Sequence, residues 1–192
     1  MRFTVYDTPV VRPLCVGLSW CLFKLTGWTL KGAPPKERKF VLIAVPHTSN
    51  WDFPLTIGLA FLFGFKIFWM GKASLFRGPA GPIMKWLGGI PIDRSKANNV
   101  VEQVVEAFNQ TDELVVTIPP EGTRSRVDQW KTGFYHIASG AGVPIALGFL
   151  DYATKTGGFG PTFYPSGDID KDIAEIRQFY ADKIGKHSDR YA

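Results

Sequence analysis

The sequence predicts a single α/β domain, in which a mixed, largely parallel sheet is flanked by helices. Short runs of β-branched and aliphatic residues alternate with helical patterns along almost the whole chain, as they do in α/β proteins. Several of these runs are followed at once by a polar segment, at the sheet edge where open α/β folds bind ligands. The length of 192 residues is enough for one well-filled core and short for two.

The composition is that of a globular protein with a positive charge. Hydrophobic residues make up 45% and charged residues 20% of the chain, which excludes disorder and low complexity. The net charge of +5 favours an anionic partner, namely a phosphorylated ligand, an anionic membrane or a nucleic acid. A charge that serves solubility is the alternative. Cys15 and Cys21 lack metal-ligand spacing, and with three histidines in the chain we expect no metal site.

Residues 10–30 form the first predicted helix. Their apolar centre, residues 14–23, has helical spacing, and Trp20 and Trp28 are amphipathic anchors of the kind found at membrane interfaces. The apolar run is shorter than the ~20 residues that a membrane span needs. We therefore expect a helix that lies in, or dips into, the membrane interface, with an ordinary core helix as the alternative.

Residues 41–45 form a predicted buried strand, and the polar segment after it leads into an apolar helix that begins at Asp52. His47 therefore lies in the loop where this strand ends. Five positions apart on one helix, two side chains would point ~140° away from each other. With His47 in a loop and Asp52 at the helix start, the carboxylate reaches back to the imidazole and fixes it as a base. In the alternative interpretation, Asp52 only caps the helix.

The rest of the chain continues the alternation. The further predicted strands are residues 66–70, 88–94, 113–118, 143–150 and 161–164. The further predicted helices are residues 98–110, 131–141 and 170–184. Residues 74–86 are predicted to be helical in part, because two Gly-Pro pairs interrupt them, and to carry apolar side chains on the surface.

Polar side chains follow four of the predicted strands. They are His47 with Asp52, Lys72, Asp93 with Arg94, and the segment from Glu121 to Arg124. Because the carboxyl ends of parallel strands share one edge of a sheet, we expect these groups to converge there. Three of the residues are cations suited to bind phosphate, namely Lys72, Arg94 and Arg124.

The loop after the strand at residues 113–118 adds three further functional groups. Gly122 lets a ligand approach the backbone closely, and Thr123 supplies a hydroxyl. Glu121 is placed to hold a substrate hydroxyl or to organise the arginines. No motif puts a serine or cysteine nucleophile near His47, so the base has to activate the hydroxyl of a substrate, or water.

Four sequence blocks resemble the glycerolphosphate acyltransferase family, of the lysophosphatidate acyltransferase type. They are His47, four residues and Asp52; a small hydrophobic strand ending in Asp-Arg at residues 89–94; Pro-Glu-Gly-Thr-Arg at residues 120–124; and Val-Pro-Ile at residues 143–145. Their order and spacing agree with the family from about residue 41 to residue 148. Pro119 and Pro91 depart from its pattern, which commonly has Phe and an aromatic residue there, so we expect differences at the acceptor end of the site.

The resemblance implies transfer of a fatty acyl group from acyl-CoA or acyl-carrier protein to a hydroxyl of a lysophospholipid-like acceptor. The first candidate for the acceptor is 1-acylglycerol-3-phosphate, in phospholipid biosynthesis or remodelling. His47 would be the general base and Asp52 its partner. The acceptor and its phosphate would be bound by Arg94, Glu121, Gly122, Thr123 and Arg124. Lys72 and Gly89 are candidates for oxyanion or donor contacts, and the reaction requires no cofactor and no metal.

The resemblance also implies where the protein acts. We expect the partners to be the lipid bilayer, the acyl donor and the acceptor, with no nucleic acid; the sequence does not indicate the oligomeric state. Residues 1–35 would be a membrane-associating helical segment and residues 36–192 the acyltransferase domain. The protein would be monotopic or peripheral on the cytoplasmic face of the cell membrane.

Three other functions remain open on the sequence. The first is an acyltransferase with a different polar-lipid acceptor. The second is a hydrolase, in which water replaces the acceptor; the intact segment from Glu121 to Arg124 argues against it. The third is a non-catalytic phospholipid-binding protein; His47 and Asp52 argue against it, because a binding protein needs no base.

Overall fold

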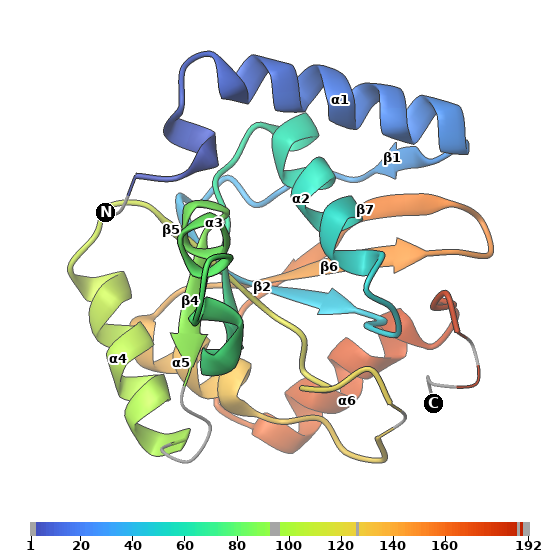
Figure 1. Cartoon of the computed structure of the whole chain (residues 1–192). Coiled ribbons are helices and arrows are strands. Elements are labelled where there is room, and N and C mark those ends of the chain that lie inside the picture. Colours follow the sequence, from blue (N-terminus) through green and yellow to red (C-terminus); the bar gives the residue numbers. More distant parts are fainter. Residues whose placement is uncertain (1–2, 93–96, 126, 188, 190–192) are drawn as a thin grey trace.

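A computed structural model describes residues 3–92, 97–125, 127–187 and 189 of the chain. Within these residues the protein forms one seven-stranded sheet between two layers of helices (Figure 1). The strands are β1 (Thr29–Lys31), β2 (Lys39–Val45), β3 (Phe68–Lys72), β4 (Gly89–Ile92), β5 (Leu114–Ile118), β6 (Ile145–Asp151) and β7 (Thr156–Phe163).

The α-helices alternate with these strands along most of the chain. They are α1 (Val11–Thr26), α2 (Asp52–Phe63), α3 (Gly81–Trp86), α4 (Ala97–Asn109), α5 (Gly133–Ala141) and α6 (Ile169–Tyr180). Two 3₁₀ helices, η1 (Val5–Asp7) and η2 (Ala73–Phe76), precede α1 and α3.

The strand order in the sheet is β1-β7-β6-β2-β5-β3-β4. The five strands from β6 to β4 are parallel, whereas β7 is antiparallel to β6 and β1 is parallel to β7. This arrangement confirms the predicted mixed, largely parallel sheet. It also brings the carboxyl ends of β2, β3, β4, β5 and β6 to one edge, as the sequence predicted.

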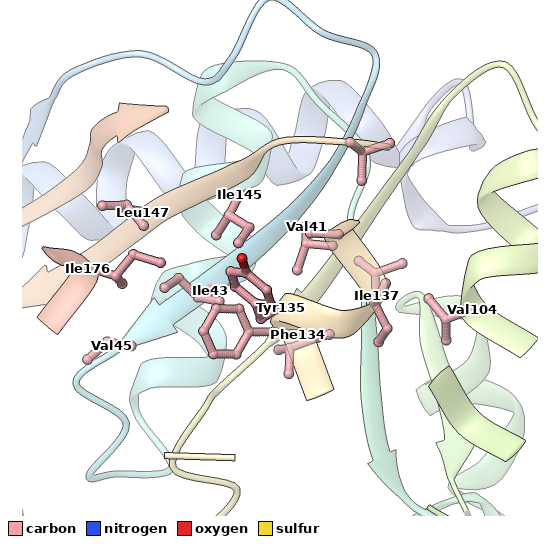
Figure 2. Close-up of a cluster of buried hydrophobic side chains, with 14 of the residues drawn as sticks. Val41, Ile43, Val45, Val104, Phe134, Tyr135, Ile137, Ile145, Leu147 and Ile176 are labelled. Atoms are coloured by element: carbon pink, nitrogen blue, oxygen red, sulfur yellow. The ribbon is translucent and has the colours of Figure 1, made fainter. Parts of the chain in front are cut away.

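The central strand β2 is apolar throughout because both of its faces are covered. Val41, Ile43 and Val45 point toward the layer of α4, α5 and α6, where they join one large core cluster (Figure 2). Phe40 and Leu42 alternate with them and contact the side chains of α2 and η1 on the other face. The strand is thereby fixed in register, so the position of the loop that follows it is fixed as well.

The N-terminal segment contributes to the fold and also exposes apolar surface. Figure 1 shows α1 lying across the outer side of α2, and Phe23 of α1 is buried there. Tyr6 of η1 packs on Phe61 of α2, with 4.6 Å between the ring centroids. Part of the predicted membrane-associating segment therefore completes the core, while the other side of α1 remains exposed.

Two elements in the N-terminal half of the chain differ from the sequence prediction. The helix predicted over residues 10–30 ends early, because Gly27 adopts a left-handed conformation with φ of 74°, and β1 follows it. The strand predicted at residues 66–70 is β3, two residues later. Lys66 instead lies outside the strand and pairs with Asp7 at 2.5 Å.

Two elements differ at the C-terminal side. The predicted strand at residues 161–164 is the end of the longer β7, whose first half is rich in glycine. Glycine is required at Gly158, because a Cβ atom there would lie 1.9 Å from the carbonyl oxygen of Lys31 in β1. The helix predicted over residues 170–184 ends at Tyr180.

Candidate functional site

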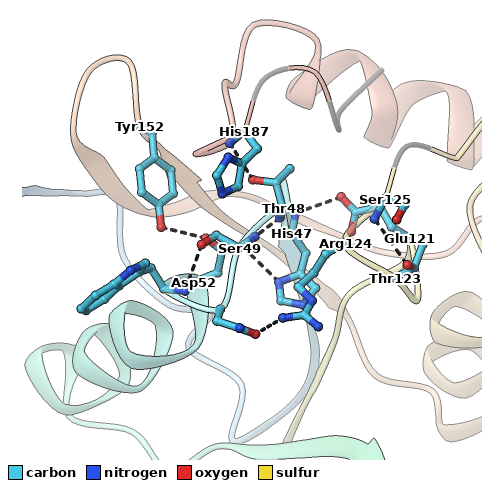
Figure 3. Close-up of polar contacts among 12 residues, drawn as sticks. His47, Thr48, Ser49, Asp52, Glu121, Thr123, Arg124, Ser125, Tyr152 and His187 are labelled. Carbon is cyan, nitrogen blue, oxygen red and sulfur yellow. Dashed lines mark hydrogen bonds and ion pairs between the residues drawn. The ribbon is translucent and has the colours of Figure 1, made fainter.

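The carboxyl ends of β2, β5 and β6 bring together four polar side chains (Figure 3). His47 lies two residues after β2, and Asp52 begins α2. Glu121 follows β5, and Tyr152 is the first residue after β6. The predicted meeting of the His47 loop with the Glu121 loop is therefore confirmed.

His47 and Asp52 interact directly. Nδ1 of His47 lies 3.2 Å from Oδ2 of Asp52. The same oxygen accepts the backbone N–H groups of Thr48 at 2.9 Å and Ser49 at 2.8 Å, so the loop is wound tightly around the carboxylate. The Asp52 side chain is 5% exposed and that of His47 28%. With Nδ1 engaged, Nε2 is the nitrogen that is available to accept a proton.

The hydrogen bonds to Asp52 keep its carboxylate ionised. Burial by itself raises the pKa of Asp52, but hydrogen bonds from His47, the Ser49 N–H and Tyr152 lower it further than burial raises it. The net pKa of Asp52 lies below the usual value of an aspartate. An ionised carboxylate beside the imidazole is the arrangement that supports general-base chemistry.

Tyr152 belongs to the site, although sequence reasoning missed it. Its hydroxyl donates to Oδ1 of Asp52 at 2.7 Å, across 100 positions of sequence. Burial and the neighbouring Asp52 both raise the pKa of Tyr152 above its usual value, which keeps the phenol protonated as a donor. One signal was present in the sequence: Tyr152 lies two residues after the strand predicted at residues 143–150, near the edge where the other polar groups were expected.

Glu121 ties the two loops together. Its Oε1 accepts the backbone N–H of His47 at 3.0 Å, so the carboxylate supports the backbone of the His47 loop. Among the described residues, the buried Oε2 has no hydrogen-bond partner. Burial raises the pKa of Glu121 above its usual value, and the N–H of His47 offsets this only in part. Gly122 has φ of 64°, a conformation that favours glycine, and a Cβ atom there would lie 3.0 Å from Cδ of Lys131.

Two of the three cations predicted for the site lie near His47 in the structure, and the third is outside the described residues. Arg124, in the loop after β5, donates a hydrogen bond to the side chain of Asn50, which lies in the same loop as His47. Lys72 ends β3 and lines the same cavity as His47. Thr123 is exposed beside Arg124. Arg94 lies outside the described residues, as does Asp93, although β4 points toward the same edge.

Gly89 is not brought to this group of residues. It begins β4 and pairs with Trp69, so it lies near the opposite end of the strand from Ile92. It is buried, and a Cβ atom at this position would meet the rings of Phe76 and Trp69. The predicted oxyanion or donor contact of Gly89 therefore has no support from its position.

A cavity of about 680 Å³ opens beside His47 and extends between α2 and the sheet. It is lined by Ala44 and Leu42 of β2 and, farther from His47, by Ile67 just before β3 and by Phe65 and Phe159, whose ring centroids lie 5.6 Å apart. Lys72, Thr123 and Arg124 line its open end. The cavity is therefore polar and basic where His47 lies and apolar in its depth, which suits an amphiphilic ligand.

A short segment covers the outer side of the His47 loop. The backbone N–H of His187 donates to Oγ1 of Thr48 at 3.2 Å, and a Cβ atom at Gly185 would lie 2.6 Å from that oxygen. The Lys186 ammonium lies 5.0 Å from the ring centroid of Trp51. Residues 183–187, called here the covering segment, therefore pack closely on the loop that carries His47.

Within the described ranges, no group of three or more histidine, cysteine, aspartate or glutamate side chains is arranged to hold a metal ion. The residues near His47 are instead a carboxylate-held imidazole, hydroxyl groups and cations. Side chains of these kinds are chemically suited to accept a proton and to bind an anionic group.

A family model and a curated relative indicate one family for this chain. The family model described as Acyltransferase matches residues 30–146. A 1-acyl-sn-glycerol-3-phosphate acyltransferase from Haemophilus influenzae is 32% identical over 134 residues, which are 65% of this chain and 54% of that protein. The chain thus spans about half the length of this curated relative.

Two further similarities complete the comparison. A protein named 5'-nucleotidase SurE, from Helicobacter hepaticus, is 32% identical over 107 residues, which are 52% of this chain and 37% of that protein. The crystal structure of the 1-acyl-sn-glycerophosphate acyltransferase PlsC from Thermotoga maritima has a TM-score of 0.60 and 19% identity. It covers 89% of this chain and 80% of that chain, which supports a common fold.

Proposed function

Because the chain belongs to the Acyltransferase family, we propose that it transfers a fatty acyl group from an acyl thioester to a hydroxyl of a lysophospholipid-like acceptor. The observation that carries the proposal is the His47–Asp52 pair at the open end of a deep apolar cavity. The name of the Haemophilus influenzae relative favours 1-acylglycerol-3-phosphate as the acceptor. The donor is acyl-CoA or acyl-carrier protein.

In the proposed mechanism, Nε2 of His47 takes the proton from the acceptor hydroxyl as the oxygen attacks the thioester carbonyl carbon. The tetrahedral intermediate then collapses, the carbon–sulfur bond breaks, and the imidazolium returns its proton to the departing thiolate. Asp52 stays ionised throughout and stabilises the charged imidazole. The thioester supplies the leaving group, so the proposed reaction needs no cofactor and no metal.

The proposed binding mode follows the polarity of the cavity. The acyl chain would occupy the apolar depth beyond Ala44, a volume within the range typical of small-molecule sites. The acceptor phosphate would lie near Arg124 and Lys72, with Thr123 and Gly122 beside it. We include Glu121 and Arg94 in the acceptor site because of the family resemblance. Arg94 also follows β4 in the sequence, and the carboxyl end of β4 lies at the same edge of the sheet as His47.

The first test is acceptor-dependent thiol release by the purified protein. We expect release from acyl-CoA or acylated carrier protein with 1-acylglycerol-3-phosphate as acceptor, in a 1:1 ratio with diacylated product. Arg124→Gln should raise KM for this acceptor about 10- to 100-fold, because a charge-assisted bond to phosphate is lost. It should leave KM for 1-acylglycerol, which has no phosphate, within about twofold.

The control is Arg38→Gln, which removes an exposed arginine that pairs with Glu113 at 2.8 Å, just before the amino ends of β2 and β5. It should change neither constant. Release without any acceptor would indicate a hydrolase and contradict the proposal. Lipid binding without release from either donor would indicate the non-catalytic phospholipid-binding protein.

We also propose that α1 docks the protein on the membrane surface, as part of the segment at residues 1–35 that precedes the catalytic domain of residues 36–192. Leu14, Leu18 and Leu25 are 60%, 60% and 88% exposed and lie along one side of the helix, at i, i+4 and i+11. Arg12 and Lys24 add positive charge, which favours the anionic cytoplasmic leaflet of the cell membrane. No helix among the described residues is long and apolar enough to cross a bilayer.

Substitution of this stripe should release the protein from membranes. We expect Leu14→Gln/Leu18→Gln/Leu25→Gln to weaken binding to vesicles with anionic lipid by at least about 100-fold, because each inserted leucine contributes about 1.5–3 kcal/mol. Vesicle co-sedimentation measures the effect. Tyr164→Gln/Ile184→Gln, which changes exposed apolar residues elsewhere, is the control and should bind like the unmodified protein. Equal binding of the triple variant would contradict docking through α1.

A further inference from the structure

We infer that Tyr152 is a positioning residue of the acyl transfer reaction, which holds Asp52 in the orientation that serves His47. This inference rests on the proposed function and deepens it. Tyr152 lies outside all four sequence blocks that relate the chain to its family, in the turn between β6 and β7.

The hydrogen bonds of Asp52 divide unequally between its two oxygens. Oδ2 receives the Thr48 and Ser49 N–H groups and faces Nδ1 of His47. The donor to Oδ1, among the described residues, is Tyr152 at 2.7 Å. The torsion about the Cβ–Cγ bond of a carboxylate is soft, and rotation about it would carry Oδ2 away from the imidazole together with Oδ1. The bond to Oδ1 stops that rotation and keeps Oδ2 directed at the imidazole.

Tyr152 is itself held on two sides. Its backbone N–H donates to the carbonyl oxygen of Ile184 at 2.8 Å, which ties it to the covering segment. Its ring meets the edge of the Trp28 ring, with 4.9 Å between centroids and an interplanar angle of 89°. Trp28 is 8% exposed, so the ring of Tyr152 rests on a fixed surface.

The turn that carries Tyr152 is fixed by Asp151. Oδ1 of Asp151 accepts the N–H groups of Ala153 at 3.1 Å and Ile184 at 3.3 Å, and Oδ2 accepts the Thr154 hydroxyl at 2.6 Å. A donor that must hold a catalytic partner within a few tenths of an ångström needs such a rigid support. These contacts distinguish Tyr152 from a surface tyrosine that happens to face a carboxylate.

The chain offers a matched control elsewhere in the fold. The hydroxyl of Tyr135 in α5 donates to Oδ2 of Asp172 in α6, also at 2.7 Å and in a buried position. This bond joins two helices in the layer that lies on the other face of the sheet from α2. It shares the chemistry of the Tyr152–Asp52 bond but has no contact with His47.

The experiment compares Tyr152→Phe with Tyr135→Phe in steady-state acyl transfer. We expect Tyr152→Phe to lower kcat about 10- to 100-fold, the usual effect of losing a hydrogen bond to a charged group, with KM for both substrates within about twofold. Tyr135→Phe should leave kcat unchanged while lowering Tm. Equal losses of kcat in the two variants would overturn the inference in favour of a purely structural contribution.

A double-mutant cycle and a pH profile test whether Tyr152 acts through Asp52. In the Asp52→Asn background, Tyr152→Phe should change single-turnover rates by less than about twofold. The acid limb of the kcat profile reflects protonation of the base. An Asp52 carboxylate that has lost the Tyr152 hydrogen bond holds the imidazolium more strongly, so the acid limb should move to higher pH. Additive effects in the cycle, or an acid limb that does not move, would contradict the inference.

The inference and the proposed function fail in distinguishable ways. If the unmodified protein transfers acyl groups and Tyr152→Phe matches it in kcat and pH profile, only the role of Tyr152 is overturned. If the unmodified protein releases no thiol with any acceptor, the proposed function is overturned and the role of Tyr152 with it.

Discussion

His47→Ala is expected to lower kcat for acyl transfer about 10³- to 10⁴-fold, because the variant has no group to accept the proton of the acceptor hydroxyl. The hydroxyl oxygen would have to attack the thioester while still protonated. KM should change little, since the acyl cavity and the cations near Arg124 stay in place. Steady-state thiol release with saturating donor and acceptor measures the effect.

The matched control is His136→Ala, which removes an exposed histidine of α5 and should leave kcat unchanged. Asp52→Asn should lower kcat about 10²- to 10⁴-fold, because an amide that donates to Nδ1 leaves the proton on Nε2, the nitrogen that must accept one. If kcat of His47→Ala stayed within about tenfold of that of the unmodified protein, the result would contradict a base at this position.

Ala44→Phe is expected to change the acyl chain-length preference about 100-fold. Ala44 lines the cavity between His47 and its far end, so a phenyl ring there shortens the apolar space. Each methylene that stays in water costs about 0.8 kcal/mol, and exclusion of about four methylenes therefore costs about 3 kcal/mol. The ratio of kcat/KM for long-chain to short-chain acyl donors should fall by about two orders of magnitude.

The measurement is kcat/KM over a series of acyl-CoA donors of increasing length. Phenylalanine is well tolerated in strands, and the side chain points into existing space, so we expect the variant to fold. Ala174→Phe, at an exposed position of α6, is the control and should leave the preference unchanged. An unchanged preference in Ala44→Phe would show that the acyl chain binds elsewhere.

The features that the sequence predicted are those encoded locally. The apolar run of β2 indicates a strand covered on both faces, and the structure confirms it through Val41 and Leu42, which point to opposite layers. His47 and Asp52 lie five positions apart, so the loop itself brings them together. The segment from Glu121 to Arg124 reaches the same edge because β5 is parallel to β2.

The features that the sequence did not predict depend on distant partners. The three residues of β1 are all exposed and carry no apolar pattern, so the strand exists only because β7 pairs with it. The requirement for glycine at position 158 likewise arises from the close approach of β1. Tyr152 acquires its role from Asp52, which is 100 positions away. Local pattern and spacing carry no information about such pairings.

The covering segment is synthesised long after the His47 loop, so the candidate site is completed late in the synthesis of the chain. The bond between His187 and Thr48 joins residues 139 positions apart. At about 5–20 residues per second, a ribosome needs about 7–28 s to travel that distance. Throughout this interval the growing chain already contains His47 and Asp52 but lacks the residues that pack on their loop. The order of the chain thus delays completion of the site until the sheet that supports it has been made.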